Sequence, residues 1–133
     1  MEVMKKFACH KMIRGNDTAW MAQHGITAQT HPIPVEQKEA FLKKKLIEEA
    51  AEVTSAPTHA KSLSELIDVQ EALWSLLAQW QLTPENFEKM CAQKRALRGS
   101  YAQGVLLTSV TMSQDHAHLD HYNAHPEKFI PIA

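Results

Sequence analysis

Glycine and proline, the residues that interrupt helices most strongly, leave three long stretches of this chain untouched. The sequence has four glycines and six prolines, and none lies within residues 35–56, 58–83 or 85–98. These stretches are rich in alanine, leucine, glutamate, lysine and glutamine, which are good helix formers. The sequence therefore predicts an all-α fold built on three long helices.

Capping signals indicate where these helices begin and end. Pro57 prevents the first long helix from continuing, and Ser62 or Ser64 can cap the second. Thr83 and Pro84 place a cap and a helix-starting proline directly before the third. A short N-terminal helix precedes all three. The expected helices cover residues 18–24, 35–54, 64–81 and 83–98.

The length of 133 residues corresponds to one domain. Hydrophobic residues make up 44% of the chain, which supports a packed core and excludes global disorder. The apolar residues 105–110 predict a short strand or extended segment. We assign residues 1–110 to a helical domain, and residues 111–133 to a histidine-rich C-terminal arm that is not an independent domain.

Composition also narrows the classes of partner. The formal net charge of -1 disfavours a nucleic-acid polymer as partner. No run of apolar residues is long enough for a transmembrane helix, and the first residues lack the apolar core of a secretion signal, so we expect no membrane partner. Cys9 and Cys91 stand in no metal-binding spacing. We expect them to be reduced thiols in a cytoplasmic protein.

Charged residues of the first long helix lie on the side expected to face the core. Glu49 is three residues after Leu46 and four before Val53, so all three share one stripe. Glu52 and Lys45 point in a similar direction. Because burial of an unpaired carboxylate is costly, this stripe needs a compensating cation, which can be Lys45 or a metal ion.

The second long helix carries Glu65 and Asp68 along the edge of its apolar face. If the two helices pack antiparallel, these residues come close to Glu49 and Glu52. Four carboxylates without a nearby histidine or cysteine are hard oxygen ligands, which favour Mg²⁺ or Mn²⁺ over zinc or copper. The alternative is that these acids are ordinary residues of a helix surface.

The third long helix carries cations on its expected inner face. Phe87, Cys91, Lys94 and Arg98 follow one another at spacings of four, three and four residues. We therefore expect Lys94 and Arg98 to project inward, where they suit the binding of a phosphate group. The alternative is that they extend from the edge of the core or stabilise the C-terminus of the helix.

Two motifs resemble the all-α nucleoside triphosphate pyrophosphohydrolases, which include MazG, the dimeric dUTPases and phosphoribosyl-ATP pyrophosphohydrolase. Residues 48–52 (EEAAE), followed after twelve residues by residues 65–68 (ELID), are similar to the EExxE…ExxD signature of this superfamily. Residues 94–105 are similar to the basic ending of short phosphoribosyl-ATP pyrophosphohydrolase-like members. Residues 11–14 match their N-terminal segment, but Gly and Asn follow where Asp and Lys are usual.

The resemblance implies a MazG-like helical bundle completed by dimerisation, as a homodimer or a higher homo-oligomer. It assigns a role in activating a water molecule to Glu48 or Glu49. The implied ligands of Mg²⁺, or possible Mn²⁺, are Glu49, Glu52, Glu65 and Asp68. The candidate residues for phosphate or substrate binding are Lys11, Arg14, Lys45, Lys94 and Arg98.

The activity implied is hydrolysis of a nucleoside triphosphate or related nucleotide to a monophosphate and pyrophosphate, in a house-cleaning role. One alternative is phosphoribosyl-ATP pyrophosphohydrolase of histidine biosynthesis. Another is a non-catalytic helical dimer that binds a ligand or a partner. Among the three tryptophans, Trp20 alone is a candidate for stacking on a base, because Trp74 and Trp80 lie on or beside an apolar helical face.

Overall fold

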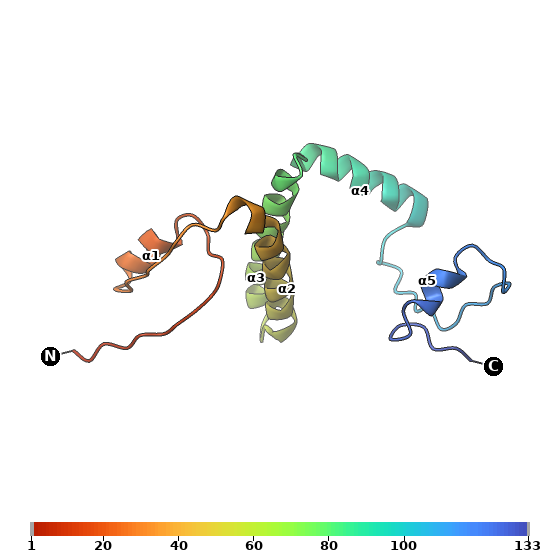
Figure 1. Ribbon diagram of the computed structural model, residues 1–133, viewed down its shortest axis with the longest axis horizontal. Helices are drawn as coiled ribbons and strands as arrows, with labels where there is room; N and C mark the ends of the chain where they lie inside the picture. The colour runs from red at the N-terminus through yellow and green to blue at the C-terminus, as the bar shows by residue number, and fades with distance from the viewer. Residues whose placement is uncertain (1, 133) are drawn as a thin grey trace. The chain divides into compact units, whose positions relative to one another are not determined.

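The computed structural model describes residues 2–132, and all regular secondary structure in this range is helical (Figure 1). The predicted all-α class is therefore confirmed. None of the described helices is both long enough and apolar enough to span a lipid bilayer. The elements are α1 (Asp17–Gln23), the 3-10 turn η1 (Val35–Gln37), α2 (Lys38–Ser55), α3 (His59–Gln79), α4 (Pro84–Arg98) and α5 (Leu119–Asn123).

The four expected helices are present, and one of them begins earlier than predicted. Thr83 Oγ1 accepts a hydrogen bond from the Asn86 amide at 3.1 Å, so α4 has the predicted cap. By contrast, α3 begins at His59 instead of residue 64, because Thr58 caps it by accepting a hydrogen bond from the Lys61 amide at 3.1 Å. Only residues 56–58 therefore connect α2 to α3.

The prediction of a strand within residues 105–110 is wrong. These residues belong to no strand or helix, and Leu106 among them is 83% exposed. A strand needs a neighbour to pair its backbone groups, and no strand is present among residues 2–132 to supply one. Strand-like residues alone do not make a strand here.

The chain divides into two compact units, Met1–Lys94 and Arg95–Ala133. The sequence had placed a boundary between residues 110 and 111. The first unit contains α1, η1, α2, α3 and most of α4. In the second unit, Tyr122 of α5 packs against Phe129 with 4.6 Å between the ring centroids, and the His121 ring lies 5.8 Å from Phe129.

The core of the first unit is the interface between α2 and α3, which lie side by side (Figure 1). Its short connection makes the pair antiparallel. The buried apolar residues of the described chain all belong to this pair: Leu42, Ala72, Leu76 and Leu77. The sequence places Trp80 on or beside an apolar helical face, but the structure leaves Trp80 exposed, together with Leu66. Instead, α3 buries Glu65 in line with Ala72 and Leu76.

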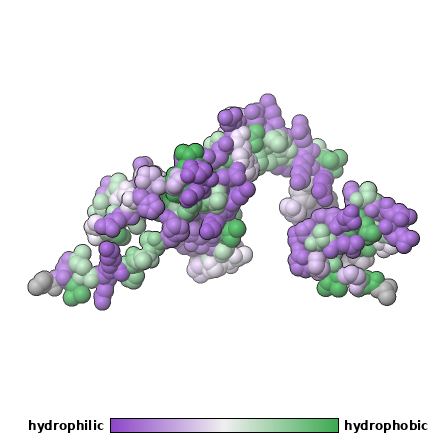
Figure 2. Space-filling view, in the orientation of Figure 1, coloured by the Kyte–Doolittle hydropathy of each residue, from purple (hydrophilic) through white to green (hydrophobic). Residues whose placement is uncertain are grey.

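Apolar side chains remain on the outside of the helix pair. Ile47 of α2 is 71% exposed, and Ile67 of α3 is 58% exposed, with Leu63 and Leu66 exposed beside it along α3. Figure 2 shows hydrophobic residues at the surface among the hydrophilic ones. The antiparallel pair therefore covers only part of the apolar surface that its own helices carry.

Because so few apolar side chains are buried, each contributes strongly to stability. We expect Leu76→Ala to lower the free energy of unfolding by about 2–5 kcal/mol, the usual cost of truncating a buried leucine. Leu106→Ala removes the same atoms from an exposed position, and should cost less than about 0.5 kcal/mol. Urea denaturation followed by circular dichroism measures both. Equal losses would show that Leu76 is not part of the core.

Candidate functional site

Three carboxylates from α2 and α3 converge in the first unit. One oxygen from each of Glu49, Glu65 and Asp68 lies within 4.8 Å of the others. Glu49 and Glu65 are only 5% and 6% exposed, and Asp68 is half-buried. Because the helices are antiparallel and adjacent, the two parts of the sequence motif meet. This set of hard oxygen donors is the kind that Mg²⁺ and Mn²⁺ bind.

One atom of this carboxylate cluster lacks a partner. Glu49 Oε1 lies 3.1 Å from Lys45 Nζ, whereas Glu49 Oε2 is buried and finds no hydrogen-bond partner among the described residues. A buried, unsatisfied carboxylate oxygen is energetically costly. A cation in the cluster would remove this cost.

Each buried glutamate has a lysine four residues earlier on its own helix. Lys45 lies beside Glu49, as the sequence suggested, and Lys61 Nζ lies 3.1 Å from Glu65 Oε1. The hydrogen bond from Lys61 and a second one from Glu52 hold the pKa of Glu65 below its usual value. Sequence reasoning missed Lys61 because it started this helix at residue 64, although the four-residue spacing was visible.

Glu52 has the opposite environment. It lines the same cavity as the cluster, but no ion pair joins it to a described cation. A hydrogen bond to Glu65, together with the negative charge of Glu49, raises the pKa of the Glu52 carboxyl. The charged form of Glu52 is therefore disfavoured by the neighbouring carboxylates.

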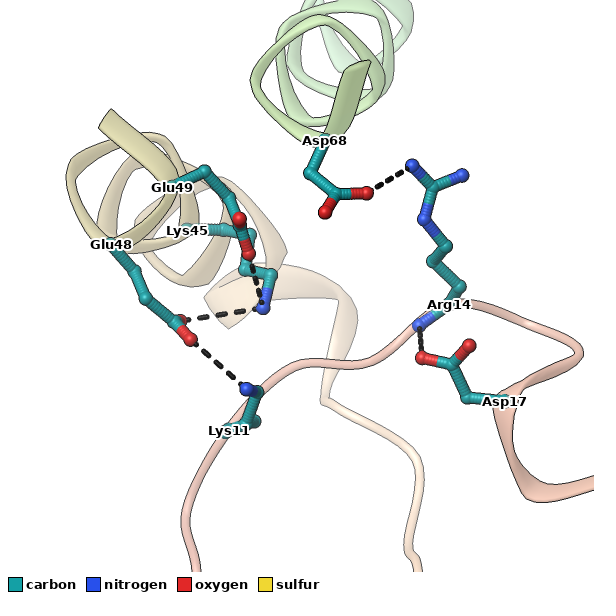
Figure 3. A network of polar contacts seen from close by, with 7 residues as sticks. All are labelled: Lys11, Arg14, Asp17, Lys45, Glu48, Glu49 and Asp68. Carbon is teal, nitrogen blue, oxygen red and sulfur yellow. Dashed lines mark hydrogen bonds and ion pairs between the residues drawn. The ribbon is translucent and has the colours of Figure 1, made fainter. Parts of the chain in front are cut away.

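The N-terminal segment (residues 11–17) contacts both helices of the pair through cations (Figure 3). Lys11 Nζ lies 3.2 Å from Glu48 Oε1 on α2, and Arg14 Nη2 donates to Asp68 Oδ1 on α3 at 2.6 Å. These hydrogen bonds raise the pKa values of Lys11 and Arg14. The Arg14 amide also donates to Asp17 Oδ2 at 2.9 Å, which fixes the start of α1 beside the carboxylates.

Glu48 is held by lysines on both oxygens. Its Oε1 pairs with Lys11, and its Oε2 lies 3.4 Å from Lys45 Nζ. Burial alone would raise the pKa of Glu48, but the hydrogen bond from Lys11 and the charge of Lys45 lower it overall. Glu48 is not among the residues that line the cavity. In the structure it anchors the N-terminal segment.

A cavity of about 880 Å³ opens beside the carboxylate cluster. This volume is typical of a small-molecule site. The lining combines anionic, cationic and aromatic groups, which suits a ligand with separate charged and aromatic parts. The candidate residues on its wall are Lys11, Arg14, Lys45, Glu49, Glu52, Glu65 and Asp68, together with Trp20.

The two cations of α4 do not have the expected inward position. Lys94 is exposed and does not line the cavity, and Arg98 is exposed and belongs to the second unit. Near its start, α4 packs the Phe87 ring 5.9 Å from that of Trp74, and Cys91 is half-buried. Beyond Cys91 every residue of α4 is exposed, so the helix has no inner face there.

Comparisons with known proteins assign no function to the site. A scan against protein-family models, a search of the curated proteins and a search of the solved structures each found no match. The resemblance to the all-α pyrophosphohydrolases therefore rests on the motifs in residues 48–68 and 94–105.

The carboxylate repulsion predicts a pH-dependent stability in the presence of a chelator. Because its pKa is raised, Glu52 binds its proton more tightly in the folded chain than in the unfolded chain. The stability that this proton confers is complete below the unfolded pKa of about 4.3, and is lost as the pH rises through the folded pKa. Glu52→Gln should therefore raise Tm at pH 7 but not near pH 4.

Thermal unfolding in EDTA at the two pH values measures this effect. Glu88→Gln, an exposed carboxylate on α4, is the matched control and should leave Tm unchanged at both. If Glu52→Gln changed Tm equally at both pH values, repulsion of the Glu52 charge would not be the cause.

Proposed function

We propose that this protein is a Mg²⁺-dependent nucleoside triphosphate pyrophosphohydrolase. The observation that carries the proposal is the buried Glu49 Oε2, which lacks a partner while two further carboxylates lie within 4.8 Å. Carboxylates are rarely buried together without a cation. The site also places Lys11, Arg14 and Lys45 around the same cavity, as a polyanionic substrate requires.

The donor set fits Mg²⁺, with Mn²⁺ as a possible substitute, because all its atoms are carboxylate oxygens. Glu49, Glu65 and Asp68 would hold the ion, and Glu52 would join them from the adjacent turn of α2. A bound Mg²⁺ ion would offset the charge of a triphosphate and increase the acidity of a water molecule.

The cations of the site bind and orient the phosphates. Arg14 presents a planar guanidinium, which pairs well with phosphate oxygens, and Lys45 contributes a charge fixed beside Glu49. Lys11 and Arg14 exchange their carboxylate partners for phosphate oxygens when the substrate enters.

The reaction needs a proton acceptor but no covalent nucleophile. The water oxygen bonds to the α-phosphorus as the bond to the bridging oxygen breaks, and pyrophosphate leaves with that oxygen. Of the two candidate proton acceptors, we assign this role to Glu49, because Glu49 lines the cavity and Glu48 does not. Glu48 holds Lys11 at the site before the substrate enters.

The helix pair supports a homodimer or higher homo-oligomer. Its outer surface carries Ile47, Leu63, Leu66 and Ile67, all exposed. Leu63, Leu66 and Ile67 share one side of α3 because they are three and four residues apart, and apolar side chains grouped in this way favour association with another protein surface. A second copy of the chain carries the same exposed apolar residues. It would form a symmetric interface with the first copy and complete the bundle.

The enzymatic proposal is tested first with Glu49→Gln. We expect the wild-type protein with Mg²⁺ to release pyrophosphate and a monophosphate from at least one member of a nucleoside triphosphate panel that also contains phosphoribosyl-ATP. Loss of the Glu49 charge should lower kcat/KM at least about 100-fold and weaken Mg²⁺ binding in calorimetry. Glu88→Gln is the control for removal of a carboxylate elsewhere.

The possible results separate the alternatives. Turnover of phosphoribosyl-ATP alone would favour the histidine-pathway enzyme. If the wild-type protein neither took up Mg²⁺ nor released pyrophosphate, the enzymatic proposal would be wrong, and a ligand-binding or interaction module would remain. Equal activity of Glu49→Gln and wild type would remove Glu49 from the mechanism.

The oligomer proposal predicts that a charge on the outer apolar stripe blocks association. We expect Ile67→Glu to lower the molar mass found by light scattering after size-exclusion chromatography to that of a monomer, because a carboxylate would have to be desolvated in the interface. Leu106→Glu, an exposed site outside this helix pair, is the control. A monomeric wild-type protein would contradict the proposal.

A further inference from the structure

The cavity carries an aromatic side chain that the phosphate chemistry does not use. Trp20 lies on the cavity wall together with the carboxylates, and it is 57% exposed. A tryptophan that is half-exposed on the wall of a polar cavity offers a flat, apolar surface to a ligand. Trp74 and Trp80 do not line this cavity.

One face of the Trp20 ring is already covered. The His24 imidazole stacks on it, with ring centroids 4.1 Å apart and an angle of 25° between the planes. His24 is itself fixed, because its Nδ1 donates a hydrogen bond to the Trp20 carbonyl oxygen at 2.7 Å. This arrangement restrains the indole, and no second ring among the described residues stacks on Trp20.

Trp20 is also tied to the phosphate-binding cations. Its amide donates to the Asn16 carbonyl oxygen at 3.1 Å, and the Asp17 amide donates to the Arg14 carbonyl oxygen at the same distance. The turn that begins at Arg14 therefore continues directly into the helix that carries Trp20. A ligand whose phosphates meet Arg14 has its remaining part close to this helix.

We propose that the face of Trp20 opposite His24 is the nucleobase subsite of this protein, and that it stacks on the heteroaromatic base of the substrate. The proposal rests on the proposed function, because it assumes that the phosphates occupy the carboxylate end of the cavity. It adds the group that distinguishes a nucleotide from an inorganic polyphosphate.

This subsite recognises a base by its face rather than by its edge. Every nucleobase has a π face, so stacking on tryptophan contributes affinity with little discrimination among bases. Nucleotides with different bases should therefore all bind. Discrimination among them requires hydrogen bonds to the base edge, for which the Asn16 side chain on the same wall is suitable.

The test is calorimetry of the full chain with Mg²⁺ and two probes. One probe is a nucleoside triphosphate analogue with an imido group between the α- and β-phosphates, which resists hydrolysis, and the other is inorganic tripolyphosphate, which has no base. We expect Trp20→Ala to weaken binding of the analogue by about 5- to 100-fold, the usual effect of removing one stacked base contact. Binding of tripolyphosphate should not change.

Two further variants make the result specific. Trp20→Phe keeps an aromatic face and should retain most of the affinity for the analogue. Trp80→Ala removes a tryptophan that does not line the cavity, and should leave both probes unaffected. Circular dichroism of each variant checks that the helices are intact.

Each other outcome overturns the proposal and identifies its cause. Unchanged binding of the analogue to Trp20→Ala would reject the base subsite while leaving the proposed function in place. Equal weakening for both probes would show that Trp20 only positions Arg14. If the wild-type protein bound neither probe, the proposed function itself would fail, and the base subsite would fail with it.

Discussion

The burial of two glutamates between α2 and α3 is the constraint on which the rest of the structure depends. An antiparallel helix pair could bury only apolar residues, but here Glu49 and Glu65 lie in the same interface as Leu42, Ala72 and Leu76. Buried carboxylates must be paired or must bind a cation. The positions of the surrounding charged side chains follow from this requirement.

Burial of the two glutamates also determines which apolar residues of α3 remain exposed. Because α3 turns Glu65 toward α2, residues near it on the helix such as Leu66 and Ile67 are left exposed. A helix pair that buried those residues would have a larger apolar core but would separate Glu65 from Glu49. The helix pair therefore buries less apolar surface within one chain but brings the carboxylates together. An arrangement that lowers stability in this way is typical of functional sites.

The sequence predicted the helices and the carboxylate positions well, because both depend on local spacing. The distribution of glycine and proline defined the long helices, and the position of Glu49 on an apolar stripe predicted its burial. Predictions that depended on tertiary contacts succeeded less often. Residues 105–110 form no strand because none of the described residues pairs with them. Lys94 does not point into a core, because few residues pack against α4. Placing the start of α3 too late also hid Lys61, whose pairing with Glu65 needs the additional turn.

The cations around the cluster fall into two kinds. Lys45 and Lys61 come from the same helices as their glutamates, at a fixed four-residue spacing, so the helix backbone keeps them close to the site. Lys11 and Arg14 come from a segment outside regular structure, so no helix backbone fixes their distance from Glu48 and Asp68. The fixed lysines satisfy one oxygen of each buried glutamate, and the N-terminal cations compensate Glu48 and Asp68. The second kind can follow the negative charge of a ligand, and for this reason the proposed function assigns substrate recognition to the segment that carries Arg14 and leads to Trp20.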